Sequence, residues 1–238
     1  MRYEAYMITY VKKVTGTVLG ILLTILLLGG CSEKSSENPI QFGTENAFRI
    51  ARINIRDFGS VIFRLYTDEE PDLCNEFIKL CKAGYYDNKS FFCIIDEYLI
   101  MGGEKTETGN PGHNVNASSS EKLHPYRGAI CASYTDGKTV DLSSFYIIGM
   151  NTEKLADIEE LIEIKGYTFS DYIKFGYKTE LTPDELENYR KYGGSPWLDG
   201  HTAVFGQAYE GFDVLDAVIS AHLENEDYEI IIDSIETN

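Results

Sequence analysis

Basic residues are scarce in this chain of 238 residues, where 21 Lys and Arg stand against 38 Asp and Glu for a formal net charge of −17. So little positive charge argues against nucleic acid as a partner, because its binding depends on cations that displace counterions. It also argues against electrostatic docking on anionic lipid. Apolar residues make up 43% of the chain and charged residues 25%, which is close to average globular usage. That composition excludes a disordered tail protein and a polytopic membrane protein.

The sequence also lacks the cysteine and histidine patterns that hold metals or disulfide frameworks. Besides Cys31 the cysteines are Cys74, Cys81, Cys93 and Cys131, and none of them forms a CxxC pair or stands at ligand spacing from a histidine. We therefore expect no metal site. Cys74 and Cys81 lie on one predicted helix, separated by about 10 Å of rise, which is too far for a disulfide. We interpret both as buried small hydrophobic residues.

A long hydrophobic run is missing as well, since the apolar stretch at residues 18–28 is short for a membrane span of about 20 residues. Lys12 and Lys13 precede this stretch, and Gly29, Gly30 and Cys31 follow it, which is the pattern of a secretory signal. Its end resembles a bacterial lipoprotein signal, which implies a lipid such as palmitate on Cys31. We interpret residues 1–30 as this signal peptide and expect the protein on the extracytoplasmic face of the cell membrane. An uncleaved membrane anchor is the alternative.

The remaining chain divides by composition. Residues 31–45 are rich in Ser and Glu and predict a flexible tether, and residues 46–238 predict one folded domain. Within it, residues 152–196 have helical spacing, and Thr182 to Glu185 form a capping box with Pro183 at the first helical position. We interpret this segment as a helical insertion. It is either a lid that binds partners over a groove or a decorative bundle.

Alternating apolar residues around a turn at 57–59 predict a β-hairpin. A helix is expected after Pro71, closed by Gly84, and a second one over 212–222. Further strands are expected at 90–95, 98–101, 128–132, 144–148, 202–205 and around 228–232. The stretch from 102 to 122 is interpreted as one long loop. This pattern suggests a mainly β protein whose antiparallel strands close into a barrel.

An ordered series of motifs resembles the cyclophilin-type peptidyl-prolyl isomerases. The matching pieces include 70–77, 84–87, 98–103, 127–129, 143–147, 197–200, 204–206 and 210–215, in the family's order and near its spacing. The resemblance implies a closed eight-stranded antiparallel barrel capped by two helices. It also implies rotation of X-Pro bonds as the reaction, no cofactor, and proline-containing segments of secreted or surface proteins as partners.

The resemblance also implies the site, residue by residue. Its peptide-binding positions are Tyr98, Leu99, Met101, Ser144, Tyr146, Trp197, Leu198 and Thr202. They form an apolar cradle for a proline ring. The family's catalytic Arg position is Cys93, its Gln positions are Met101 and Ser144, and its His position is Thr202. The catalytic residues of this chain are therefore unknown, and we expect a weak isomerase.

Several alternatives remain open at this point. Arg64 or Arg127 could replace the missing cation from another strand. A non-catalytic proline-peptide binder or holdase, or an unrelated surface adhesin, could stand in place of the isomerase. Cys93 is either a reactive thiol or a strand residue without chemistry, and Trp197 is either a pocket rim or ordinary core. The four histidines are interpreted as solvated or structural residues.

Overall fold

A computed structural model describes residues 39–43, 49–105, 112–118 and 120–238. The predicted signal peptide, the predicted lipid site Cys31 and most of the predicted tether lie outside the described residues. In the part of the chain that is described, no helix has both the length and the apolar character needed to cross a bilayer.

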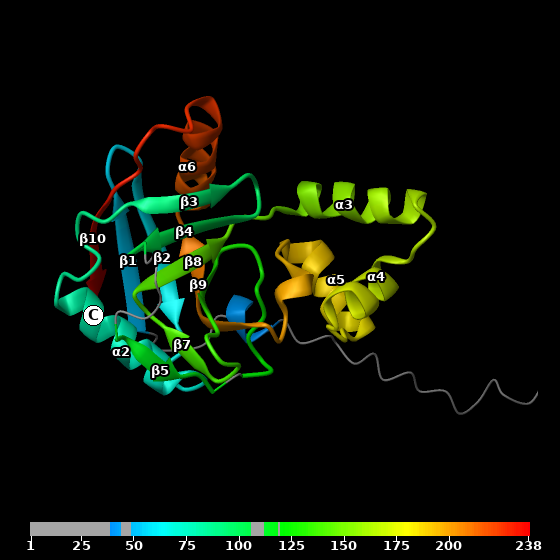
Figure 1. Ribbon diagram of the computed structural model, residues 1–238, viewed down its shortest axis with the longest axis horizontal. Helices are drawn as coiled ribbons and strands as arrows, with labels where there is room; N and C mark the ends of the chain where they lie inside the picture. Colours follow the sequence, from blue (N-terminus) through cyan, green and yellow to red (C-terminus); the bar gives the residue numbers. More distant parts are fainter. Residues whose placement is uncertain (1–38, 44–48, 106–111, 119) are drawn as a thin grey trace, which may run out of the picture. The chain divides into compact units, whose positions relative to one another are not determined.

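Eight antiparallel strands in the described residues form one sheet, in the order β10-β1-β2-β9-β6-β8-β4-β3. Their bounds are β1 Arg49–Ile55, β2 Gly59–Leu65, β3 Phe91–Ile95, β4 Leu99–Gly103, β6 Ala129–Ser133, β8 Ser144–Ile148, β9 Thr202–Glu210 and β10 Ile232–Thr237. Figure 1 shows β3 and β4 crossing the direction of β1 and β2, so that the sheet curls round on itself. The predicted hairpin is confirmed, because β1 and β2 pair along their whole length.

The expected closed barrel is wrong, because the sheet is an open half-barrel whose edge strands are β10 and β3. These edges are linked by one isolated bridge between Ser90 and Ile231, with hydrogen bonds from Phe91 N to Ile230 O and from Ile232 N to Lys89 O, both 2.8 Å. Beyond that point β10 follows β1, and its hydrogen-bonding groups pair there instead of with β3. The last strand therefore starts at Ile232 rather than near residue 228.

Two helices pack on this sheet as the sequence predicts. The first is α2, Pro71–Lys82, which buries Leu73, Cys74, Phe77 and Cys81. The second is α6, Phe212–Glu224. Both cysteines are free and buried as expected, and burial raises the pKa of the Cys74 thiol to about 12. The main core lies inside the curl of the sheet, where side chains such as Phe63, Phe145 and Phe205 pack.

Residues 152–192 carry three helices, α3 Thr152–Ile164, α4 Phe169–Tyr177 and α5 Pro183–Tyr192, grouped to one side of the strands in Figure 1. The capping box opens α5, where the Thr182 hydroxyl accepts from the Glu185 N–H and the Glu185 carboxylate accepts from the Thr182 N–H. The helices bury Leu155, Phe169 and Tyr189 in a second core. That core also contains Leu99 and Tyr146 of the sheet, so the helical segment covers part of the face that carries the predicted cradle.

Two local features differ from the sequence-based expectation. The segment predicted as one long loop contains β5, Asn114–Asn116, which pairs with β7, Thr139–Asp141. Residues 39–43, inside the predicted tether, are packed rather than flexible. Their short 3-10 turn η1, Ile40–Phe42, buries Gln41 and stacks Phe42 on Tyr192 with 3.7 Å between ring centroids. Buried apolar and polar contacts outweigh the linker-like composition there.

Candidate proline-binding site

Four neighbouring strands place one side chain each in a single row across a face of the sheet. Cys93 pairs with Met101, Met101 with Tyr146, and Tyr146 with Cys131. Directly opposed residues in antiparallel strands point to the same face, as do residues two apart, so Leu99 joins the row from β4. Cys93 and Met101 are half-buried, whereas Tyr146, Leu99 and Cys131 are buried. The row is apolar except for the Tyr146 hydroxyl.

The single indole of the chain lies beside this row. A short 3-10 turn, η2, Pro196–Leu198, carries Trp197, whose Nε1–H donates to the Tyr98 hydroxyl at 3.0 Å. The two rings are 6.0 Å apart between centroids. Tyr98, Met101, Trp197 and Leu198 are half-buried and pack against the second core. The structure thus brings these predicted site residues together with Leu99 and Tyr146.

Thr202 closes the floor of this cradle. It begins β9, and its side chain hydrogen bonds with the Tyr146 hydroxyl and donates to the Ala132 carbonyl at 3.1 Å. Burial raises the pKa of Tyr146, so its hydroxyl stays protonated at neutral pH. Thr202 is only 8% exposed. Its hydroxyl, at the position where the family has His, is therefore engaged in hydrogen bonds within the protein.

Ser144 lies on the same strand as Tyr146. It begins β8, two residues before Tyr146 and therefore on the same face, and its register partner is Gly103 rather than a cradle residue. It therefore lies beside the row, two residues from Tyr146 along β8.

Both arginines suggested as substitutes have partners outside the cradle. The Arg64 guanidinium donates to the Gly43 carbonyl at 2.6 Å and lies over the Tyr209 ring. The Arg127 guanidinium pairs with Asp216 and lies over the Phe212 ring. Both guanidinium groups therefore contact groups outside the cradle, and these contacts give the substitution hypothesis no support.

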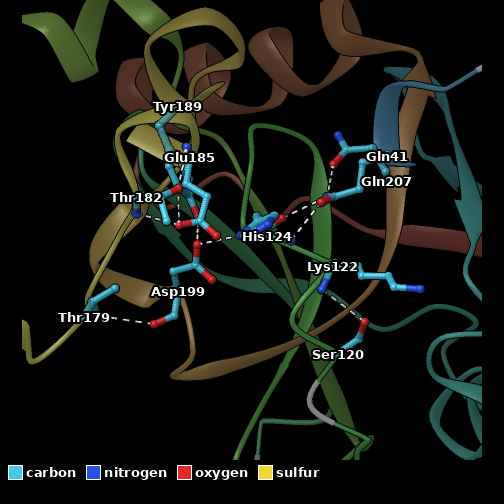
Figure 2. A network of polar contacts seen from close by, with 10 residues as sticks. All are labelled: Gln41, Ser120, Lys122, His124, Thr179, Thr182, Glu185, Tyr189, Asp199 and Gln207. Atoms are coloured by element: carbon cyan, nitrogen blue, oxygen red, sulfur yellow. Dashed lines mark hydrogen bonds and ion pairs between the residues drawn. The ribbon is translucent and has the colours of Figure 1, made fainter. Parts of the chain in front are cut away.

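A buried polar network holds the turn that carries the indole, and sequence reasoning missed it. Figure 2 shows Asp199 between His124 and Tyr189. The Asp199 carboxylate accepts from the Tyr189 hydroxyl at 2.8 Å and lies 2.7 Å from His124 Nδ1. Because Asp199 follows Leu198 directly, these contacts fasten η2 to α5 and to the 120–124 loop.

The charge state of His124 depends on this pairing. Burial alone would lower the pKa of His124, but the hydrogen bond and negative charge of Asp199, with Glu185 adding to them, raise it overall. The imidazolium and the Asp199 carboxylate therefore form a partly buried ion pair as the histidine protonates. The sequence left each histidine as either solvated or structural, and His124 is a structural residue.

Gln41 extends the network to the N-terminal turn. Its side-chain amide donates to the His124 carbonyl at 2.9 Å and to the Gln207 side chain at 3.0 Å, and its oxygen accepts from the His124 N–H at 2.7 Å. Gln41 is 2% exposed and Gln207 1%. Nothing in the linker-like composition around Gln41 signals this role, because its partners are 83 and 166 residues away.

A cavity of about 430 Å³ lies beside Thr202. Three segments line it, with contributions from 120–124, 178–185 and 199–204, together with Glu70 and Tyr134. Glu70 is buried and accepts hydrogen bonds from the Ser118 and Ser120 backbone N–H groups. Among the described residues, no group of three or more His, Cys, Asp and Glu side chains is arranged to hold a metal ion.

The model of the family described as cyclophilin type peptidyl-prolyl cis-trans isomerase/CLD matches residues 50–237, and the chain belongs to that family. The prediction from the ordered motifs is confirmed, and the alternative of an unrelated adhesin is wrong. By class, the chain is therefore a peptidyl-prolyl cis-trans isomerase.

Relatives agree with this assignment, and solved structures share the fold. A Staphylococcus saprophyticus protein named "Putative peptidyl-prolyl cis-trans isomerase" is 29% identical over 209 residues, which cover 84% of this chain and 98% of that protein. A Staphylococcus epidermidis protein of the same name is 28% identical and covers 75% of this chain. A Cryptosporidium parvum cyclophilin type isomerase has a TM-score of 0.55 at 22% identity and covers 81% of this chain and 98% of its own, which shows the fold. That protein was also crystallised in the presence of the dipeptide Ala-Pro, with a TM-score of 0.53.

Proposed function

We propose that this chain is a weak peptidyl-prolyl isomerase that assists the folding of extracytoplasmic proteins. One observation carries the proposal. In a member of the cyclophilin family, an apolar cradle of Tyr98, Leu99, Met101 and Tyr146 lies beside the half-buried indole of Trp197. Crystallisation of the Cryptosporidium isomerase in the presence of Ala-Pro supports a proline-containing ligand for this chain as well.

The chemistry suits such a cradle. Rotation about the peptide C–N bond faces a resonance barrier of about 18–20 kcal/mol, and X-Pro bonds interconvert over tens of seconds without help. A site lowers this barrier when it binds the twisted amide better than either planar isomer. The apolar floor seats the proline ring and excludes water. Stabilising the twisted amide requires, in addition, a polar side chain that donates a hydrogen bond.

The proposed weakness follows from that missing donor. Cys93 and Met101 stand side by side where the family has Arg and Gln, so the polar half of the site is a contiguous apolar patch. Loss of one preorganised donor costs about 2.7–4 kcal/mol of transition-state stabilisation in other enzymes, or 10²–10³ in rate. Binding of the proline ring does not depend on that donor, so we expect binding to be retained.

The same apolar patch favours a second function, a non-catalytic proline-peptide binder or holdase. An isomerisation assay on a proline tetrapeptide, coupled to a protease specific for the trans isomer, separates the two functions. Acceleration above the buffer rate that scales with protein concentration supports the isomerase. A rate equal to that of buffer, together with measurable peptide binding, removes the isomerase and leaves the binder.

We also propose that the protein acts on the outer face of the cell membrane, held by a lipid on Cys31. The run of Lys12 and Lys13, the apolar stretch and Gly29-Gly30 before that cysteine support this location. Radiolabelled palmitate should enter the wild-type protein and be absent from Cys31→Ala, with Cys93→Ala as the matched control. Labelling that persists in Cys31→Ala contradicts the lipid anchor.

A further inference from the structure

Four aromatic side chains form a continuous row that leads away from the cradle. The Tyr98 and Trp197 rings are 6.0 Å apart, Trp197 and Tyr177 are 6.1 Å apart, and Tyr177 and Tyr172 are 5.8 Å apart, all between centroids. We call these four residues the aromatic row. Its first two members belong to the cradle, and its last two belong to α4.

The helical segment places the outer half of this row. Helix α4 packs against the turn η2 that carries Trp197. The Tyr177 carbonyl lies 2.9 Å from His201 Nε2, which ties the end of α4 to the loop before β9. The row is therefore fixed in place by the turn, the loop and the helix.

The outer members of the row are open to solvent. Tyr172 is 37% exposed and Tyr177 is 41% exposed, so neither ring is a core residue. Aromatic faces and edges bind other rings and apolar side chains in offset or edge-on contacts. Steps of about 6 Å match two residues of an extended peptide, which advances about 3.3 Å per residue. A peptide with its proline in the cradle thus reaches Tyr177 and Tyr172 within a few residues.

We propose that Tyr172 and Tyr177 form a specificity site for an aromatic or proline side chain that flanks the isomerised proline of the client. The site rests on the proposed function, since it extends the cradle in which that proline sits. It makes the client class an extended segment with a second ring-bearing residue near its proline. The helical segment of residues 152–192 thereby contributes to substrate specificity.

The single tryptophan supplies the readout, because Trp197 is the one indole of the chain and lies in the row. Peptides free of tryptophan are titrated while the Trp197 fluorescence is followed. The set comprises an Ala-Pro tetrapeptide and longer peptides with Phe or Ala at two to four residues on either side of the proline. We expect Phe on one side to bind about three- to tenfold more tightly than Ala at the same position.

Variants of the aromatic row then show which side chains are responsible for the tighter binding of the Phe peptides. Tyr172→Ala and Tyr177→Ala should erase the difference between the Phe and Ala peptides. Phe175→Ala is the matched control, because Phe175 lies on the same helix, is 75% exposed and makes no ring contact with the row. That variant should keep the difference. Thermal unfolding of each variant checks that the fold is intact.

The outcomes separate this site from the proposed function. If the tetrapeptide binds but flanking Phe adds nothing on either side, the aromatic site is overturned and the isomerase proposal stands. If Phe175→Ala erases the difference as fully as Tyr177→Ala does, the specific site is again overturned. If no proline peptide binds while the protein is folded, the proposed function itself fails.

Discussion

Cys93 on β3 and Met101 on β4 are direct cross-strand partners, and each is half-buried. They occupy the two positions at which the resembled family carries its catalytic Arg and a Gln. Their pairing means that the two polar positions of the family correspond here to one pair of neighbouring side chains without a strong hydrogen-bond donor. A guanidinium restored at one position would lie next to an amide restored at the other.

Restoring that pair should therefore raise turnover. We expect Cys93→Arg to accelerate tetrapeptide isomerisation by up to about 10²–10³, and Cys93→Arg with Met101→Gln to exceed it. Leu223→Arg is the matched control, since it adds the same charge at an exposed position, 54% exposed, on α6 rather than on a strand of the cradle. The protease-coupled assay measures all three. An unchanged rate in a folded Cys93→Arg protein would mean that the cradle has been misassigned.

The His124–Asp199 pair should make stability depend on pH. Since the pKa of His124 is raised in the folded state, its contribution is complete below the unfolded pKa of about 6.5 and is lost as pH rises through the folded value. We expect the difference in unfolding free energy between wild type and His124→Gln to be largest below pH 6.5 and to shrink as the pH rises through the raised pKa of the folded state. Urea unfolding at a series of pH values measures this difference. A difference for His124→Gln that does not change with pH would contradict the ion pair.

The N-terminal turn should stabilise the domain through Gln41. Its removal leaves the His124 N–H, the His124 carbonyl and the Gln207 amide oxygen without this buried partner. We expect Gln41→Ala to lower the free energy of unfolding by about 1–3 kcal/mol. The neighbouring Ile40→Ala, at a position 37% exposed, should cost less than about 1 kcal/mol. Chemical denaturation compares the two, and equal small losses would show that the turn does not hold the network.

The approach of the Trp197 loop to residues 125–126 should depend on Gly194. This glycine has a φ of +122°, and an added Cβ would lie 2.5 Å from the Pro125 carbonyl oxygen and 2.6 Å from Tyr126 Cα. We expect Gly194→Ala to destabilise the fold by roughly 2–5 kcal/mol, through strain and backbone overlap, and to shift Trp197 fluorescence. Gly200→Ala is the control, because its φ of +71° is also left-handed but nothing lies within 4 Å of the added atom. Equal losses in both variants would contradict the close approach.

Local structure followed closely from sequence pattern. Alternation predicted the β1–β2 hairpin, and Pro71 with the apolar spacing behind it predicted α2, because both depend on contacts between near neighbours. The capping box at Thr182 was readable for the same reason. The edge of the sheet could not be predicted from local pattern, because the register of β10 depends on β1, which lies about 180 residues earlier in the chain. The pairing of β5 with β7 escaped notice because each strand has only three residues.

The site divides in the same way. The sequence alone determined the family, the apolar residues of the cradle and the replacement of its polar positions by Cys93 and Met101, because a linear series of motifs carries residue identities. Only the tertiary structure decided that these two residues are paired, that Asp199 joins His124 to Tyr189, and that α4 continues the aromatic row. Such relationships arise from packing between segments far apart in the chain, where geometry rather than local spacing selects the partner.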